Sequence, residues 1–418
     1  MAEAATLEKP RRFAALQHRN FTLLWSGLIV SNAGTWMQNV AQGWLVLQLT
    51  NSPLWLGLLG LSFALPMIIL PFFGGVTVDR INRIKLLYIT QTGMMLTAFM
   101  LAILTWLHMV TVYHILAASF ISAVFLAFDN PARQALVPDL VAKEDLLNAL
   151  SLNSATYTGA ALIGPAIAGA LLGIAGAGSL FFINGLSFLA VLFALASMHD
   201  VRTHSGGENT SIKKSVLAGL SFAWKSRFIL ALLALSTVTA IFGRSYQNLL
   251  PIFARDIWHG GAGGYGFLLA SSGGGALLGA FALAAFSDIR RPGMVLIISG
   301  LIFSISIILF AESPSLIWGV VFLFINGFSA TAVGTIIATF IQVTVPNELR
   351  GRIISLYTIT LIGLPSLGSL GSGAAAELLG GIQGAPRAVL IGGVIVGILI
   401  LFTFPIFWRR IMDRREKK

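Results

Sequence analysis

A regularly spaced series of amide and hydroxyl side chains lies within an apolar stretch near the start of the chain. Thr35, Gln38 and Gln42 follow one another at steps of three and four residues, and Asn32 and Asn39, seven residues apart, widen the same helical stripe. These groups donate and accept hydrogen bonds but are weak acids, bases and nucleophiles. We expect them to line a cavity that binds a small molecule; hydrogen bonding between helices is the alternative.

Two later apolar stretches carry further polar residues. Arg244, Gln247 and Asn248 precede Pro251 in one of them, and Asn326 lies within the other. Such groups cost free energy when they are removed from water without a partner. We expect them to face the same cavity as the first stripe. Arg244 could instead neutralise a buried carboxylate or extend its guanidinium to a membrane surface.

Asp129 is the acidic residue best placed to move a proton. Most of the 16 acidic residues lie in polar segments, but Asp129 comes late in an apolar stretch, and Arg133 follows one helical turn later. A carboxylate partly removed from water can exchange its proton when its surroundings change. Asp129 and Arg133 are therefore the candidates for proton coupling. The alternative is structural, because Asp129-Asn130-Pro131 also has the pattern of a helix cap followed by proline.

Arrangements of residues that are typical of enzymes are not found. The chain has no cysteine, which excludes disulfides and thiolate metal sites. Its six histidines have no metal-ligand spacing, and the Gly-rich phosphate-binding sequence that ends in Gly-Lys-Ser/Thr is absent. We expect a protein that is not an enzyme and that holds no metal or cofactor.

Long apolar helices must position these polar residues. Of the 418 residues, 56% are hydrophobic and 10% are charged, whereas a soluble domain has about 25% charged residues. Helices of about 20 apolar residues cross a bilayer, and lipid does not accept open backbone structure. We predict an all-α membrane protein of twelve transmembrane helices, at residues 21–48, 54–76, 85–107, 112–130, 146–172, 178–197, 229–250, 264–286, 294–311, 315–342, 354–380 and 387–408.

The basic residues lie on alternate sides of these spans. Of the 27 Lys and Arg residues, all except Arg244, Arg255 and Arg387 lie at the termini or in the even-numbered connections. This is the distribution of the positive-inside rule, and it predicts an even number of spans with both termini in the cytoplasm. The net charge of +11 indicates contact with anionic lipid headgroups. Nucleic-acid binding is not expected.

Two short motifs recur in the second part of the chain. Asp79-Arg80 has its counterpart in Asp288 and the arginines after it, and Val137-Pro138 recurs as Val345-Pro346, at offsets of 209 and 208 positions. Such repeats are typical of transporters, whose halves move about a site near the membrane midplane. We predict two six-helix halves, at 1–200 and 229–418, joined by a cytoplasmic linker with an amphipathic helix at 201–228. The protein is expected to be monomeric.

The segment from Gly75 to Lys85 contains Asp79, Arg80 and Arg83 and resembles the signature of the major facilitator superfamily between spans two and three. Asn82 stands where the signature has a second glycine, and a tight loop is still possible there because Asn tolerates left-handed dihedral angles better than most residues. The resemblance implies that Asp79 holds the cytoplasmic ends of the two halves together. The residues assigned to this cytoplasmic gate are Gly75, Asp79, Arg80, Arg83, Asp288, Arg350 and Arg352.

Span five is similar to the fifth span of exporters in this superfamily. It contains Gly164, Pro165 and Gly169, and small residues at this spacing let helices approach closely. We expect them to serve helix packing. The expected loops at 129–139 and 345–352 narrow the resemblance to the branch of the enterobactin exporter and the macrolide and multidrug efflux proteins.

The resemblance implies a secondary active transporter in the bacterial cytoplasmic membrane. It would export a small, partly apolar organic molecule, drug-like or siderophore-like, by proton antiport and alternating access. A facilitator or importer of the same fold is the first alternative. A lipid-handling membrane protein or enzyme is the alternative from another class, but it would need an acid–base or metal constellation at membrane depth.

The expected topology can be tested by labelling, because the chain has no native thiol. Single cysteines at Ser205, Ser313 and Gln383 should differ in their reaction with an impermeant thiol reagent added outside intact cells. Ser205→Cys should stay unlabelled, since it lies in the cytoplasmic linker, and the other two should react. External labelling of Ser205→Cys would contradict the predicted topology.

Overall fold

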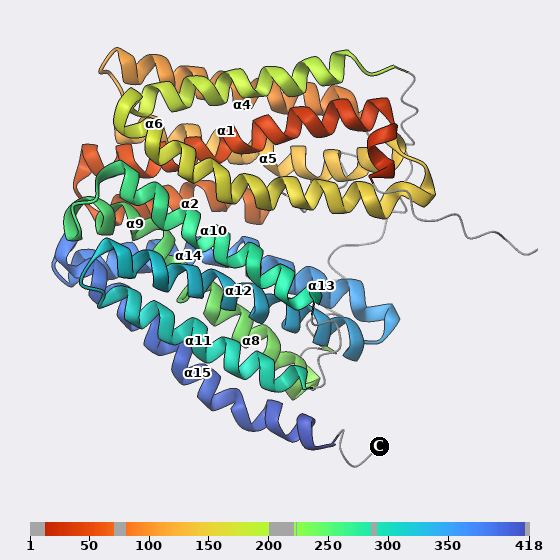
Figure 1. The fold of residues 1–418 in the computed structure, drawn as a ribbon, viewed down its shortest axis with the longest axis vertical. Coiled ribbons are helices and arrows are strands. Elements are labelled where there is room, and N and C mark those ends of the chain that lie inside the picture. Colours follow the sequence, from red (N-terminus) through yellow and green to blue (C-terminus); the bar gives the residue numbers. More distant parts are fainter. Residues whose placement is uncertain (1–12, 71–80, 200–220, 223, 286–290, 414–418) are drawn as a thin grey trace, which may run out of the picture.

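The computed structural model describes residues 13–70, 81–199, 221–222, 224–285 and 291–413, which form helices and short connections, with no strand among them. Figure 1 shows the helices in two groups, one built from the first part of the chain and one from the second. The first group contains α1 (Arg19–Thr50), α2 (Pro53–Ile69), α4 (Arg83–Trp106), α5 (Val112–Leu140) and α6 (Leu146–Ala196), with the short helices η1 (Ala14–Gln17) and η2 (Lys143–Asp145).

The second group contains shorter and more interrupted helices. Its members are α8 (Arg227–Ile241), η3 (Ser245–Leu249), α9 (Leu250–Ile252), η4 (Phe253–Ile257), α10 (Gly261–Ala285), α11 (Pro292–Ala311), α12 (Leu316–Thr344), α13 (Asn347–Ile362), α14 (Leu364–Leu378), η5 (Gly381–Gly384) and α15 (Ala385–Asp413). In Figure 1 the first group, from red to lime, lies above this second group, from green to blue.

The helices have the length and composition of membrane spans. Nine helical segments in the described part of the chain are long and apolar enough to cross a membrane, and α2, with 17 residues, is shorter. α6 has 51 residues, and its backbone leaves helical geometry at Gly176, with φ of 73° and ψ of 171°. Glycine adopts such angles without steric cost. The predicted all-helical membrane architecture is confirmed, and the number of twelve spans stays a prediction.

The predicted end of span four is wrong. α5 continues through Pro131 and Pro138 to Leu140, so the segment expected to be a loop is helical. Asp129 therefore lies inside a helix, and the alternative in which it caps one is excluded. Interior prolines cost helix stability, but Ala132, Leu136 and Leu140 of this extension are buried in an apolar cluster with residues of α1 and α4. This packing outweighs the local preference.

Asn82 begins α4 without left-handed dihedral angles: its φ is −56°, and its side chain accepts hydrogen bonds from the backbone N–H groups of Ile84 and Lys85 as the cap of that helix. One further local prediction is wrong. The segment expected to be a loop at 345–352 is helical from Asn347 onward. Gly75, Asp79, Arg80, Asp288 and nearly all of the 201–228 linker lie outside the described residues.

Glycines bring the two groups into backbone contact. A Cβ atom added to Gly169 of α6 would lie 2.7 Å from the Cα of Gly266 in α10. A Cβ added to Gly373 of α14 would lie 2.6 Å from the carbonyl oxygen of Pro53, at the start of α2. Real side chains do not fit at these distances, so α6 packs on α10 and α2 packs on α14 only because these positions carry glycine.

Two charged side chains of the second group hold the connection between α1 and α2. Arg255 donates to a carbonyl oxygen in the last turn of α1 at 3.1 Å and to Oδ1 of Asn51 at 2.7 Å. Glu377 accepts from Oγ of Ser52 at 2.7 Å and from a backbone N–H in the first turn of α2 at 3.4 Å. Each charge lies at the helix end whose dipole favours it. We call Asn51, Ser52, Arg255 and Glu377 the end clamp.

Removing either charge of the end clamp should loosen this end of the bundle. Glu377→Gln and Arg255→Gln each remove a charge–dipole interaction of roughly 0.5–1 kcal/mol, and this shifts a two-state equilibrium roughly two- to fivefold. Spin labels at Met109→Cys, before α5, and Ile317→Cys, in the first turn of α12, are both exposed and should report a larger separated population.

Arg387→Gln is the matched control, because Arg387 is an exposed arginine at the start of α15, near the same end. It should leave the distance distribution unchanged. If both clamp variants also leave it unchanged, the glycine contacts alone keep this end closed.

Candidate functional site

A cavity of about 260 Å³ lies between the two groups of helices. It is lined from both sides by polar, aromatic and aliphatic residues: Trp36, Asn39, Val40, Gln42, Leu59, Gly60, Phe63, Ser119, Arg244, Gln247, Asn248, Tyr265, Leu269, Pro365, Ser366 and Ser369. Five of the residues predicted to line a cavity are therefore brought together: Asn39 and Gln42 from α1, and Arg244, Gln247 and Asn248 from the second group. Their role in binding a substrate stays a prediction.

Interrupted helices place the polar residues of the second group. α8 ends at Ile241, and Arg244 precedes the short helix η3, which carries Gln247 and Asn248. α13 ends at Ile362, and the next helix, α14, begins after Gly363. Irregular backbone at membrane depth is tolerated where it is buried in protein or lines a cavity. Both interruptions lie at this cavity, since Pro365 of α14 also lines it.

Only some of the polar residues predicted to form a stripe on α1 line the cavity, and the others pack against neighbouring parts of the protein. Asn39 is exposed although it lies well inside α1, and it lines the cavity. Gln42 is 5% exposed, and its Nε2 has no hydrogen-bond partner among the described residues. Asn32 and Thr35 are half-buried and do not line the cavity; the Thr35 hydroxyl donates to the carbonyl oxygen of Ser31 at 2.9 Å.

Gln38 and Asn326 are placed differently from the prediction. Oε1 of Gln38 accepts from Nδ2 of Asn184 in α6 at 2.8 Å, so this amide joins α1 to α6 within the first group. Asn326 accepts from the Tyr246 hydroxyl at 2.8 Å and donates to the Ser306 hydroxyl at 3.1 Å. Both residues are almost fully buried, and neither lines the cavity. They are hydrogen-bonded within their own groups of helices.

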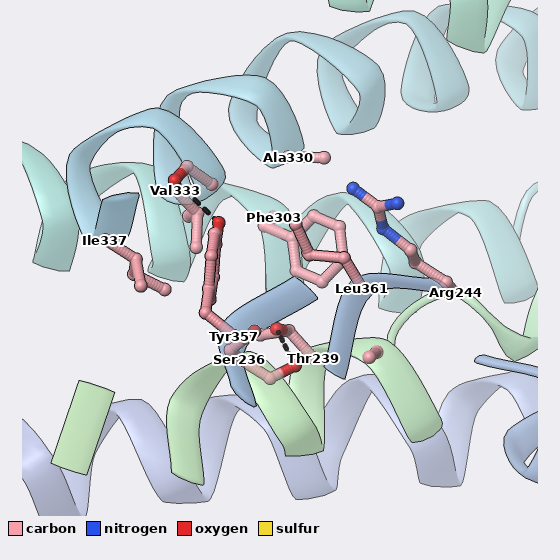
Figure 2. A pocket seen from close by; sticks show the side chains of 11 residues that line it. Ser236, Thr239, Arg244, Phe303, Ala330, Val333, Ile337, Tyr357 and Leu361 are labelled. Atoms are coloured by element: carbon pink, nitrogen blue, oxygen red, sulfur yellow. Dashed lines mark hydrogen bonds between the residues drawn. The ribbon is translucent and has the colours of Figure 1, made fainter. Parts of the chain in front are cut away.

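Arg244 lies between two cavities. Besides the large one, it lines a pocket of about 20 Å³ inside the second group, which has room for about one water molecule. Figure 2 shows the Arg244 guanidinium at one end of this pocket and the Tyr357 ring at the other. The Tyr357 hydroxyl donates to the carbonyl oxygen of Gly334 at 2.8 Å. No hydrogen bond or ion pair of the Arg244 side chain is formed with any described residue.

Asp129 is fully buried between α4 and α5. Its Oδ1 accepts from Oγ1 of Thr90 and from Nε2 of Gln91, both at 2.8 Å. Its Oδ2 lies 2.7 Å from Nε of Arg133, whose side chain is 15% exposed. This contact is an ion pair without hydrogen-bond alignment, since Oδ2 makes no hydrogen bond. Asp129 and Arg133 thus form an ion pair, and their role in proton coupling stays a prediction.

The described residues of the predicted gate lie apart from the cavity. Nη1 of Arg83 donates to Oδ2 of Asp139 at 2.5 Å, which joins the start of α4 to the end of α5. Arg350 and Arg352 lie in the first two turns of α13, and Nε of Arg350 is buried without a hydrogen-bond partner among described residues.

The predicted packing residues lie at close helix contacts. A Cβ added to Gly164 would lie 2.6 Å from Cβ of Trp36 in α1, within the first group. Gly169 and the carbonyl oxygen of Pro165 face Gly266 of α10, between the groups.

Several lining residues were missed by the sequence reasoning. Ser366 and Ser369 follow Pro365 in a glycine- and serine-rich helix, and their spacing of three was a usable signal. Trp36 and Tyr265 gave no sequence signal of a cavity, because aromatic residues inside apolar helices are mostly core residues. Among the described residues, no group of three or more His, Asp or Glu side chains could hold a metal ion.

Comparisons with known proteins agree with this architecture. The chain is 25% identical over 354 residues to the staphyloferrin A transporter of Staphylococcus aureus, and the alignment covers 83% of this chain and 87% of the relative. It is 28% identical over 345 residues to the enterobactin exporter EntS of Shigella boydii, with 79% and 78% covered. Both relatives are transporters of siderophores and not enzymes.

A solved structure shares the fold. The bacterial homologue of the human lysosomal transporter Spinster, in an inward-facing and unoccupied conformation, superposes with a TM-score of 0.72 at 16% identity over 97% of this chain and 98% of that chain. A family model described as "Transmembrane secretion effector" matches residues 11–410, nearly the whole chain. The chain therefore belongs to the transmembrane secretion effector family of the major facilitator superfamily and is a multi-pass membrane transporter.

Proposed function

We propose that this protein exports a small, partly apolar organic molecule across the bacterial cytoplasmic membrane, by alternating access and in exchange for protons. The observation that carries the proposal is the polar cavity between two groups of helices that are clamped together at one end. A binding site that opens to one side at a time is the requirement of alternating access. The two groups would be the predicted six-helix halves.

The distribution of basic residues supports an orientation for this state. With both termini in the cytoplasm, the end clamp lies on the outer side, because α1 runs from the inner side to Asn51. The structure would then be an inward-facing state, closed outside by the end clamp and the glycine contacts. The remaining gate residues, with Asp79 foremost, would close the inner side after the halves rock.

The lining residues support a substrate with both polar and apolar parts. Trp36, Leu59 and Phe63 offer apolar surface, and the amides of Asn39 and Gln247 are exposed to the cavity. The names of the relatives support siderophores as candidates, and one of them is named as an exporter. An importer or facilitator of the same fold is the second candidate function, since the other relative is named only as a transporter.

The Asp129–Arg133 pair supports proton coupling within the first half. Thr90 and Gln91 hold Oδ1 of Asp129, whereas Oδ2 is held only by the ion pair with Arg133. Oδ2 is thus the atom that can take a proton without breaking a hydrogen bond. Protonation would cancel the attraction to Arg133 and leave this partly exposed arginine with the hydrogen bond that its Nη2 donates to Oδ1 of Asn130 at 2.8 Å. A change in the protonation of Asp129 would thereby alter the contacts of Arg133, whose side chain reaches the surface of the half.

Export can be tested in inverted membrane vesicles that contain the protein. Enterobactin and staphyloferrin A are the first substrates to try, because they appear in the names of the relatives. Uptake into the vesicles should require an inside-acidic proton gradient and stop when an uncoupler dissipates it. Uptake that ignores the gradient would indicate a facilitator. Gradient-driven uptake found only in right-side-out vesicles would indicate an importer.

Asp129→Asn should separate driven transport from exchange. The variant keeps an oxygen for Thr90 and Gln91 but cannot gain or lose a proton at this site. Transport driven by the gradient should fall to the level of vesicles without a gradient, while exchange of labelled for unlabelled substrate should persist.

Asp145→Asn is the control, because Asp145 is a carboxylate of the same group of helices that pairs with His18, outside the assigned gate. It should leave the coupling intact. Loss of both driven transport and exchange in Asp129→Asn would assign Asp129 a structural role, and loss of neither would remove it from the mechanism.

A further inference from the structure

Arg133 and Arg244 differ in how their charges are balanced. Arg133 pairs with Asp129 at 2.7 Å. Arg244, in the interrupted part of the seventh predicted span, forms no ion pair or hydrogen bond with the residues that the structure describes. A guanidinium does not lose its proton in proteins. Arg244 therefore brings an uncompensated positive charge to the wall of the cavity.

The surroundings of Arg244 add donors and no opposing charge. The residues that line the large cavity include no Asp or Glu. Nε2 of Gln42 is a buried amide donor that also lines this cavity and finds no partner among the described residues. An unpaired buried donor costs about 1–3 kcal/mol, and an unpaired charge at membrane depth costs more. The cost at Arg244 is recovered when an acceptor with a negative charge enters the cavity.

We propose that the cavity is an anion site, in which Arg244 binds an oxyanion of the transported molecule, such as a carboxylate. The guanidinium presents a planar pair of N–H donors that fits the two oxygens of a carboxylate. Trp36 and Phe63 line the same cavity and can contact the apolar body of the molecule. This inference rests on the proposed transport function and gives its substrate class: organic acids that carry an apolar part.

The potential inside the cavity can be measured without knowing the substrate. Gln247 is exposed in the cavity three residues after Arg244, and the chain has no native cysteine. A Gln247→Cys reporter is reacted with two methanethiosulfonates of similar size, the anionic sulfonatoethyl and the cationic trimethylammonioethyl reagent, in purified protein without a gradient. The ratio of their rates cancels the reactivity and accessibility of the thiol and reports the local charge.

Arg244 should make this ratio favour the anionic reagent. Arg244→Gln should lower it by about tenfold, because one elementary charge acts in opposite directions on the two reagents, and Arg244→Glu should lower it further. Arg387→Gln removes an arginine outside the cavity and should leave the ratio unchanged. A Met109→Cys reporter, exposed before α5, should be insensitive to Arg244. An equal ratio with Arg and Gln at position 244 would overturn the proposal.

Binding of the anion itself is tested by protection of the same reporter. Benzoate should slow the labelling of Gln247→Cys, and benzamide, its uncharged analogue, should do so about tenfold less well, since hydrogen bonds to charged groups are the stronger ones. The preference should disappear with Arg244→Gln and persist in part with Arg244→Lys. Equal protection by the two compounds would contradict an anion site.

A lipid headgroup is the other source of an oxyanion at this depth. The protection experiment is therefore repeated in nanodiscs of phosphatidylcholine, with and without phosphatidylglycerol. Protection by benzoate in both membranes supports a soluble organic anion as the ligand. Protection by phosphatidylglycerol alone, without any effect of benzoate, would assign Arg244 to a lipid and overturn the proposal. These measurements need neither a gradient nor a direction of transport, so they can fail while export holds, or hold while export fails.

Discussion

Lipid offers no hydrogen-bond partner to a polar side chain, and this constraint decides where each polar residue of the chain lies. Gln38 reaches Asn184, Asn326 reaches Tyr246, and Asp129 is held by three side chains. These groups are paired inside one group of helices and hold it together. Arg244 and Gln42, by contrast, line the cavity where the two groups face each other, and neither Arg244 nor Nε2 of Gln42 finds a partner among the described residues.

The same constraint explains what could be predicted from the sequence. Long apolar stretches must be helices in a membrane, so the architecture follows from composition and length. The direction of a single side chain does not follow. Gln38 and Asn39 are neighbours and carry the same amide group, yet Gln38 joins α1 to α6, whereas Asn39 faces the cavity. That difference depends on the position of Asn184, which is 146 residues away in the chain.

At helix ends and interruptions, tertiary packing also overrides the local structure that single residues favour. Proline at 131 and 138 favoured a loop, but the apolar face of Ala132 and Leu136 finds a buried place against α1 and α4, and the helix continues. In the second group the opposite happens, because helices that looked continuous are interrupted near Gly243 and at Gly363. The interruptions are tolerated because the backbone groups that lose their helical hydrogen bonds lie beside a cavity. The sequence pattern does not show where that cavity is.

The connection between α1 and α2 consists of Asn51 and Ser52 only, and the end clamp grips both of them. Because the link has only two residues, a displacement of the end of α1 also displaces the start of α2. Arg255 lies in η4 and Glu377 in α14, and between them they hold both residues of this link. Moving the link away from the second group therefore has to break hydrogen bonds to two separate elements of that group.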